Sequence, residues 1–481
     1  MTKPLSRREM LYCAGGLLAA TTARAQSPAI SQVMTTLSTF MSAAATAPLP
    51  ADVVEKTKHM ILDTLAAMIS GSELPPGRFA INFARAYKGD RIATVAGSNV
   101  LCGPIEAALA NGMLAHSDET DDTHPPSQSH PGCSTIPAAL AAGERFNISG
   151  RQFLRAVTLG YDVGTRVTAT LGRLEYMFDS HRSTHSIAGT FCAAAAAGCA
   201  ASLNAQQMRW LLSYTAQQAS GTAAWQRDTD HVEKAFDFAG MPARNGVTAA
   251  LLVQAGGTGV GDIFSGADNF FDAFQPKNKP DMVIDKLGER YEITRTNIKK
   301  WTVGSPIQAP LDALEILLKR YKFEPDQVKQ IVVRDATNEA KIVDNREIPD
   351  ICLQHMIAVM LIDKTASFKS AHDVARMKDP AILKQRAKVQ LVGDEALEKL
   401  MPRRVGIVEV TLNDGMKYTE RVDNVRGTFE NPMPREEVIA KARDLIVPVL
   451  GATVAAQLIK VVFDIENVKS ILELRPLIQK V

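Results

Sequence analysis

One run of residues near the middle of the chain has almost only small side chains. Residues 186–202 read SIAGTFCAAAAAGCAAS, in which Ile187 and Phe191 are the large exceptions. Alanine favours helix, and small side chains let two helix axes approach closely. The run therefore predicts a helix buried inside a helical core. A transmembrane role is disfavoured because no matching apolar spans accompany it.

Helical periodicity extends over most of the chain up to about residue 266. Residues 51–70 place apolar side chains near a 3.6-residue period, and Pro104 suits the first turn of another helix. A chain of 481 residues, 46% hydrophobic and 22% charged, is long enough for two or three domains. Further helices are predicted at 137–146, 150–171, 205–219 and 242–255.

The pattern changes after about residue 269. Asn413-Asp414-Gly415 predicts a hairpin turn between two strands, and helical stretches at 310–320 and 370–375 lie among the strands. This mixture predicts a smaller α+β domain over about 270–428. Its strands are predicted at 331–334, 388–392, 408–412 and 417–422.

The chain returns to helix after Pro432 and Pro434. The helices predicted at 436–450 and 453–459 are too few to form a core of their own, so we expect them to pack on the first domain. The predicted fold is mainly α. Its large helical domain is discontinuous and comprises residues 27–269 and 429–481.

The first 25 residues resemble a twin-arginine export signal. Arg7 and Arg8 precede a weakly apolar stretch at 10–20, and residues 23–25 form an A-x-A cleavage site. The stretch is about half the roughly 20 residues that span a bilayer, so a permanent anchor is disfavoured. We expect a periplasmic protein that folds first and then crosses by the twin-arginine translocation machinery.

Charge and cysteine usage exclude several classes of protein. A formal net charge of +2, with no basic run, argues against a nucleic-acid surface. Beyond the signal the cysteines are odd in number and form no CxxC motif, which disfavours a disulfide framework or a structural zinc site. We expect buried free thiols at Cys102, Cys133, Cys192, Cys199 and Cys352.

Residues 115–132, which read AHSDETDDTHPPSQSHPG, concentrate acids and histidines between two predicted helices. Loops on rigid helix ends commonly carry active sites. Three interpretations are open: a metal site, a solvated acidic turn that caps helices, and an acid–base site in which carboxylates and imidazoles shift one another's pKa. The spacing matches no H-E-x-x-H, EF-hand or zinc-ribbon pattern, so the metal interpretation fits least well.

Several motifs together resemble the MmgE/PrpD family, which includes 2-methylcitrate dehydratase and cis-aconitate decarboxylase. The loop contributes the runs 111–116 and 121–123 and the pair His130-Pro131. The resemblance covers nearly all of residues 30–470. Further matches lie at 189–191, Lys234 with 240–246, 257–259, 311–313, Gly427 and Asn431-Pro432.

This resemblance implies a large helical domain with a smaller α+β lid, and a homodimer. It also implies an enzyme that needs no metal, nucleotide or iron–sulfur cofactor. The family's members act on small di- and tricarboxylic acids, transferring a proton next to a carboxylate while water or carbon dioxide leaves. The partner that this implies is a small carboxylic acid substrate.

The same resemblance assigns candidate roles in catalysis. His130 is expected to transfer the proton, assisted by Glu119, Asp122 or His185. Lys234 is expected to neutralise a carboxylate or to stabilise an enolate-like intermediate.

Two further residues are expected to bind substrate. Arg244 would hold a carboxylate, with a structural ion pair as the alternative, and Thr123 would donate a hydrogen bond.

The chain also departs from the family pattern. Glu119 replaces the usual aspartate, Ser183 and Gln308 stand where histidines are usual, and one residue is inserted between Thr123 and His130. Gln308 would still line the substrate site but cannot carry a proton. Three hypotheses follow: a metal-independent lyase, an isomerase or hydrolase that uses the same pocket, and an inactive periplasmic protein that binds carboxylates.

Overall fold

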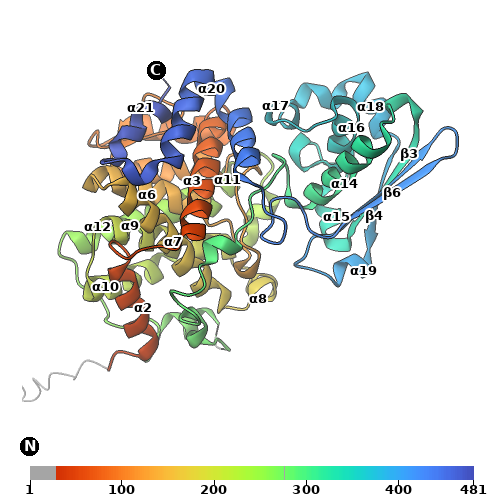
Figure 1. Ribbon diagram of the computed structural model, residues 1–481. Coiled ribbons are helices and arrows are strands. Elements are labelled where there is room, and N and C mark those ends of the chain that lie inside the picture. The colour runs from red at the N-terminus through yellow and green to blue at the C-terminus, as the bar shows by residue number, and fades with distance from the viewer. Residues whose placement is uncertain (1–28, 276, 481) are drawn as a thin grey trace, which may run out of the picture.

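The computed structural model describes residues 29–275 and 277–480, so the predicted export signal at 1–25 lies outside the described residues. Figure 1 shows a larger helical body beside a smaller body that contains the main sheet. The mainly α fold is confirmed.

The small-residue run forms helix α9 (Thr184–Ala200) at the centre of the larger body. All its residues except His185 are buried. Helices α7 (Gly150–Ala169), α12 (Met241–Gln254) and α6 (Gly132–Phe146) pack around it. Because α9 carries so many small side chains, these neighbours approach its backbone closely.

The other main helices of this body surround that centre. The helices at 51–71, 104–115 and 205–218 follow predicted ranges, whereas those at 32–43, 75–86 and 173–180 were not predicted. Helix α6 begins at Gly132 rather than near Pro137, which lies inside the helix. A proline is favoured in a first turn but can also sit further along at the cost of one hydrogen bond. These helices are α2 (Gln32–Ala43), α3 (Ala51–Gly71), α4 (Pro75–Ala86), α5 (Pro104–Ala115), α8 (Arg173–Ser180) and α10 (Ala205–Gln218).

The smaller domain begins later in the structure than the sequence predicts. Phe270 and Ile293 belong to the core of the helical body, and Phe270 packs edge-to-face on Phe191 of α9 with 5.1 Å between ring centroids. The second hydrophobic core starts at Trp301 and ends at Val425. The reason for the difference is that the apolar side chains of Phe270 and Ile293 pack into the larger core, which local periodicity does not reveal.

The lid, which we define as residues 301–425, is built on a four-stranded sheet. The strand order is β4 (Val389–Asp394), β3 (Val328–Ala336), β5 (Gly406–Leu412), β6 (Lys417–Val422), with β3 and β4 parallel and the other pairs antiparallel. Gly415 has φ +90° in the predicted hairpin turn. The lid helices include α14 (Ser305–Tyr321), α15 (Thr337–Val343), α16 (Leu353–Asp363), α17 (Phe368–Ala371), α18 (Pro380–Arg386) and α19 (Glu395–Glu398).

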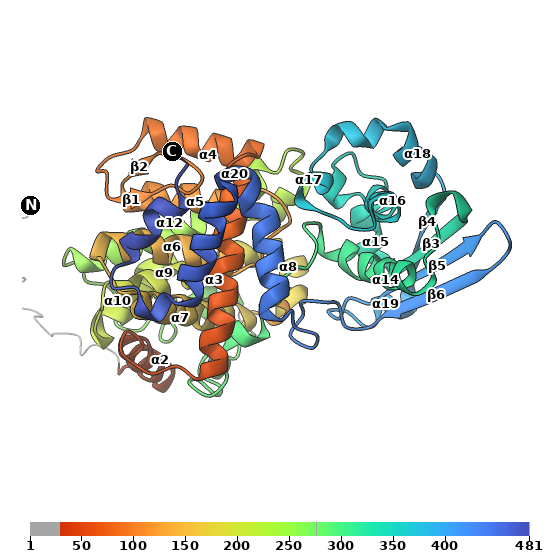
Figure 2. The same cartoon turned by 45° about the horizontal axis from the view of Figure 1, so that its top comes forward.

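Helix α20 (Arg435–Phe463) returns the chain to the helical body. Gly451, with φ +80°, kinks it between the two helices that the sequence predicts. By length and apolar composition α20 is the one helix in the described part of the chain that could cross a membrane. In this structure it lies along α3, as Figures 1 and 2 show, and its buried Lys441 pairs with Asp63 of α3 at 2.7 Å.

The close approach of α7 to α9 generates a stability prediction. A Cβ atom at Gly164 would lie 2.3 Å from Cys192 Sγ and 2.4 Å from the backbone oxygen of Ala188, whereas one at Gly198 would meet the flexible side chain of Leu211 at 2.6 Å. We expect Gly164→Ala to lower the free energy of unfolding by about 1–3 kcal/mol, because backbone cannot move aside as a side-chain end can.

Gly198→Ala is the matched control, and its better helix propensity should offset most of its steric cost. Urea denaturation followed by circular dichroism measures both. Equal losses of stability in the two variants would show that the α7–α9 contact is not tight.

Candidate active site

The acid- and histidine-rich loop, residues 116–131, joins α5 to α6 and is held by distant parts of the chain. Thr123 pairs with Asn297 through two backbone hydrogen bonds of 3.1 and 2.7 Å. Lys441 of α20 donates to the backbone oxygen of Thr120 at 2.9 Å. These contacts order a segment that has too few apolar side chains to order itself.

Asp121 lies between two histidines of the same loop. Its Oδ2 is 2.9 Å from His116 Nδ1 and its Oδ1 is 3.0 Å from His130 Nδ1. Burial opposes ionisation of Asp121, but the adjacent His116 and His130 hold its pKa well below its usual range. A buried carboxylate stays charged only when such donors compensate the loss of water.

His130 is a neutral imidazole at neutral pH. Burial lowers its pKa to about 4, although Asp121 acts in the opposite direction. The hydrogen bond to Asp121 places the proton on Nδ1, which leaves Nε2 free to accept one. The histidine side chain is 12% exposed, whereas that of Asp121 is fully buried. His130 therefore has the tautomer of a general base.

Two lysines bring positive charge to the same loop. Lys234 Nζ donates to Glu119 Oε1. Lys299 Nζ donates to the backbone oxygen of Glu119 at 2.7 Å and lies 3.7 Å from Asp121 Oδ1. Burial alone would raise the pKa of Glu119, but Lys234 and Lys299 hold it well below its usual range. The cluster thus contains the carboxylates of Glu119 and Asp121 and the ammonium groups of Lys234 and Lys299, so its negative and positive charges are equal in number.

Phe238 forms a platform for the imidazoles. It lies in a π-helical turn (Phe236–Gly240), where the backbone widens. The His185 ring stacks on it with 3.8 Å between centroids, and the His116 ring stacks at 4.5 Å. His185 lies beside His130, with 5.1 Å between their centroids, and burial holds the pKa of His185 well below its usual range.

Ser183, which stands where a histidine is usual in the family, caps α9. Its side chain accepts from the backbone of Ser186 and donates to Asp237 at 2.5 Å. Ser183 therefore stabilises the first turn of α9. The imidazole close to His130 comes from the neighbouring His185.

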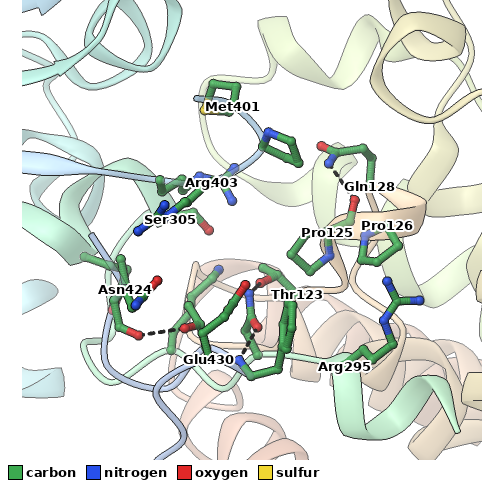
Figure 3. Close-up of a pocket in the computed structure, with 18 of the residues that line it drawn as sticks. Thr123, Pro125, Pro126, Gln128, Arg295, Ser305, Met401, Arg403, Asn424 and Glu430 are labelled. Atoms are coloured by element: carbon green, nitrogen blue, oxygen red, sulfur yellow. Dashed lines mark hydrogen bonds between the residues drawn. The ribbon is translucent and has the colours of Figure 1, made fainter. Parts of the chain in front are cut away.

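A cavity of about 580 Å³ opens between the two bodies (Figure 3). Thr123 and Lys299 line it from the helical body. Because Lys299 also contacts Glu119 and Asp121, it connects this cavity to the histidine cluster. Residues that line it from the lid include Ser305, Gln308, Leu400, Met401, Arg403 and Arg404.

Two of the predicted residues have side chains committed to other contacts. Gln308 lines the cavity, but its Nε2 donates to the oxygens of Trp301 and Val303 at 2.7 and 2.9 Å. Asp122 is buried behind the loop, where it accepts hydrogen bonds from Tyr161 Oη at 2.5 Å and from the nitrogen of Gly132 at 3.0 Å.

The structure does not bring Arg244 to the cavity. Its guanidinium donates to Asn245 at 3.0 and 3.1 Å and lies over the ring of Phe236 at 5.9 Å. The residue lies on α12 and, within the described part of the chain, does not line the cavity.

Sequence reasoning missed several residues that the structure brings to the site. His231 packs on His116 with 5.2 Å between ring centroids, and its Nδ1 is 4.0 Å from Glu119. His231 lies three residues before Lys234, and this closeness to a predicted site residue is a sequence signal from which it could have been found. Lys299 had a weaker signal, as the first of two lysines before the lid, and Arg404 had none.

His372 contacts the loop from the lid. Its Nε2 lies 2.9 Å from Asp118 Oδ2 and 4.0 Å from Asp350 Oδ2, and its Nδ1 is 2.8 Å from the oxygen of Phe368. Burial alone would lower the pKa of His372, but Asp118 raises it to about 9. The ion pair therefore ties the lid to the residue next to Glu119.

A metal could be considered at His116, Asp121 and His130, whose ligand atoms lie within 4.8 Å of one another. The Nδ1 atoms of His116 and His130 each lie at hydrogen-bond distance from a different carboxylate oxygen of Asp121. A metal would have to replace both protons. The residues fit paired hydrogen bonds better than a chelate.

The chain matches the MmgE/PrpD N-terminal domain over residues 35–283 and the MmgE/PrpD C-terminal domain over residues 301–466. It therefore belongs to the MmgE/PrpD family. The second match begins where the core of the lid begins and continues into α20.

Among its relatives are proteins named cis-aconitate decarboxylase. The one from Homo sapiens is 26% identical over 441 residues, which cover 87% of this chain and 88% of that protein. The one from Aspergillus terreus is 26% identical over 453 residues, covering 88% and 90%. The cis-aconitate decarboxylase-like protein oryM of Aspergillus oryzae is 29% identical over 303 residues, 59% of this chain and 61% of that protein.

The His372–Asp118 ion pair predicts a pH dependence of stability. The folded-state pKa of His372 is raised from 6.5 to about 9, so its contribution is complete below pH 6.5 and is lost as the pH rises through 9. We expect His372→Gln to reduce the free energy of unfolding by about 1–3 kcal/mol at pH 6 and by much less at pH 9.5. Ionisation of Asp350, whose pKa burial raises to about 7, leaves this sign unchanged.

Urea denaturation of the wild-type protein and the variant across this pH range measures the effect. His181→Gln, a change at an exposed histidine, is the control and should show no such dependence. A stability difference that does not change with pH would mean that His372 is uncharged in the folded protein.

Proposed function

We propose that this chain is a lyase that acts on a small di- or tricarboxylic acid, either as a decarboxylase or as a dehydratase. The single observation that carries this proposal is the neutral His130 imidazole, oriented by Asp121, in a cluster where Lys299 lies 3.7 Å from Asp121 and Lys234 pairs with Glu119. Membership of the MmgE/PrpD family, and relatives named cis-aconitate decarboxylase, support the same class of reaction.

The arrangement fits proton transfer at a carbon next to a carboxylate. In dehydration, His130 Nε2 would remove the proton from that carbon, the electron pair would form the double bond, and hydroxide would leave as water after protonation. In decarboxylation, the carbon–carbon bond would break, carbon dioxide would leave, and the remaining electron pair would take a proton from Nε2 of an imidazolium, so His130 or His185 would first have to bind a proton from solvent or substrate. His185 is placed to serve as the second proton carrier.

The lysines would stabilise the negative charge that both reactions develop. Without substrate, Lys234 is paired with Glu119 and Lys299 lies between Glu119 and Asp121. A substrate carboxylate would share or replace these contacts. Ammonium groups held in place in a buried site stabilise an enolate-like intermediate more than water can.

The alternative is a protein that binds carboxylates without turnover. The observation that favours it is Gln308, whose amide stands where the family usually has a histidine and is occupied by backbone hydrogen bonds. An amide cannot act as a general acid or base at neutral pH, so a chain with Gln308 has one proton carrier fewer than the usual family pocket.

Two further features belong to the proposal. Periplasmic export is supported by the twin-arginine pair Arg7-Arg8, and the homodimer is supported by resemblance to the family.

We expect His130→Asn to reduce turnover by about 10²- to 10⁴-fold while the fold is retained, because the amide removes the base without removing the hydrogen-bonding side chain. The mature chain from Gln26 would be incubated in D₂O with cis-aconitate, citrate, 2-methylcitrate and malate, and followed by proton NMR. His181→Asn makes the same chemical change at an exposed histidine and is the matched control.

Loss of water or carbon dioxide from any of these acids would support a lyase. Deuterium exchange without loss of mass would instead favour an isomerase, and binding without either reaction would favour the binding protein. Wild-type turnover by His130→Asn would remove His130 from the mechanism.

A further inference from the structure

Arg404 enters the cavity region from the lid, in the segment between α19 and β5. It lines the cavity, and its side chain is 29% exposed. Its Nε donates to Glu339 Oε2 of α15 at 2.9 Å. Within the described residues the guanidinium makes this one hydrogen bond, so both terminal nitrogens are available.

The other arginines of the cavity differ in this respect. Arg426 donates Nε and one terminal nitrogen to Glu437, each at 2.8 Å. Arg295 gives a terminal nitrogen to Glu292 at 3.0 Å, and Arg403 has one 3.5 Å from Asp423. Each of these three directs a terminal nitrogen to an acid, whereas Arg404 does not.

Nearby acids keep the Arg404 guanidinium charged. Burial alone would lower its pKa, but Glu339, and to a smaller extent Asp335 and Glu119, raise it. Glu119 is the acid that Lys234 and Lys299 contact. The guanidinium is therefore a positive charge on the lid side of the cavity that Lys299 lines from the helical body.

We propose that Arg404 binds a carboxylate of the substrate through its two terminal nitrogens while the reacting end of the same molecule lies at Lys299 and His130. The inference rests on the proposed function and extends it, because it names the residue that binds the carboxylate distant from the reacting carbon. A guanidinium anchored at Nε presents its remaining N–H groups in the fork that a carboxylate accepts.

This contact would also couple binding to the position of the lid. Arg404 and Lys299 come from different bodies, so one molecule that contacts both would hold the cavity closed around itself. Such positioning at both ends is a general means of orienting a reacting carbon. Leu400, Met401 and Pro402 line the cavity beside Arg404 and would exclude water from the bound carboxylate.

The test is isothermal titration of the mature chain with tricarballylate, a saturated tricarboxylate without hydroxyl or double bond, and with butyrate, which has one carboxylate. We expect Arg404→Met to weaken tricarballylate binding about tenfold or more while butyrate binding is unchanged. Arg404→Lys keeps the charge but not the fork, and should fall between the wild type and Arg404→Met.

Two further variants separate binding from a structural role. Glu339→Gln removes the partner of Arg404 but leaves the guanidinium, so it should weaken tricarballylate binding far less than Arg404→Met does. Arg320→Gln changes an arginine that is paired with Glu420, 52% exposed and absent from the cavity lining, and should bind as the wild type does. Thermal melts would show that each variant is folded.

Unchanged tricarballylate affinity in Arg404→Met would overturn the proposal, as would equal weakening by Glu339→Gln or a wild type that binds no tricarballylate. The lyase proposal is tested apart from it by turnover. A wild type that binds tricarballylate through Arg404 but converts none of the candidate acids would uphold this inference and contradict the lyase.

Discussion

The ionised carboxylate of Asp121, buried between His116 and His130, is the interaction on which the site depends. A charge taken out of water must be compensated, and here two imidazole donors and the nearby Lys299 do so. The same hydrogen bonds select the tautomer of His130. The electrostatics that keep Asp121 charged thus also prepare His130 as a base.

This buried charge explains why the loop is held from so many directions. Lys441 reaches it from the C-terminal helix and Asn297 from the segment that leads to the lid, while His372 reaches it from within the lid. Each contact places a polar group against the loop, where apolar packing is scarce. The loop connects the ends of α5 and α6, and the large core around α9 keeps these helix ends rigid.

Much of the fold could be predicted from local pattern. The buried small-residue helix, the hairpin at Asn413–Gly415 and the return of α20 to the helical body follow from composition and period. The start of the lid does not follow from local pattern, because Phe270 joins the larger core through contacts with residues distant in sequence. For the site, the sequence indicated the loop and Lys234 but misplaced Arg244, since a charged residue near a motif carries no information on the direction of its side chain.

By itself, the sequence determined the class of fold and the residues that can handle protons, since helix propensity, hydrophobic period and side-chain chemistry are local properties. Only the tertiary structure decided which charges meet. It paired Glu119 with Lys234 and Lys299, placed His185 beside His130, and brought Arg404 to the cavity from the lid. These pairings depend on how two bodies pack, because Coulomb energies and pKa shifts follow distance and burial in space rather than separation along the chain.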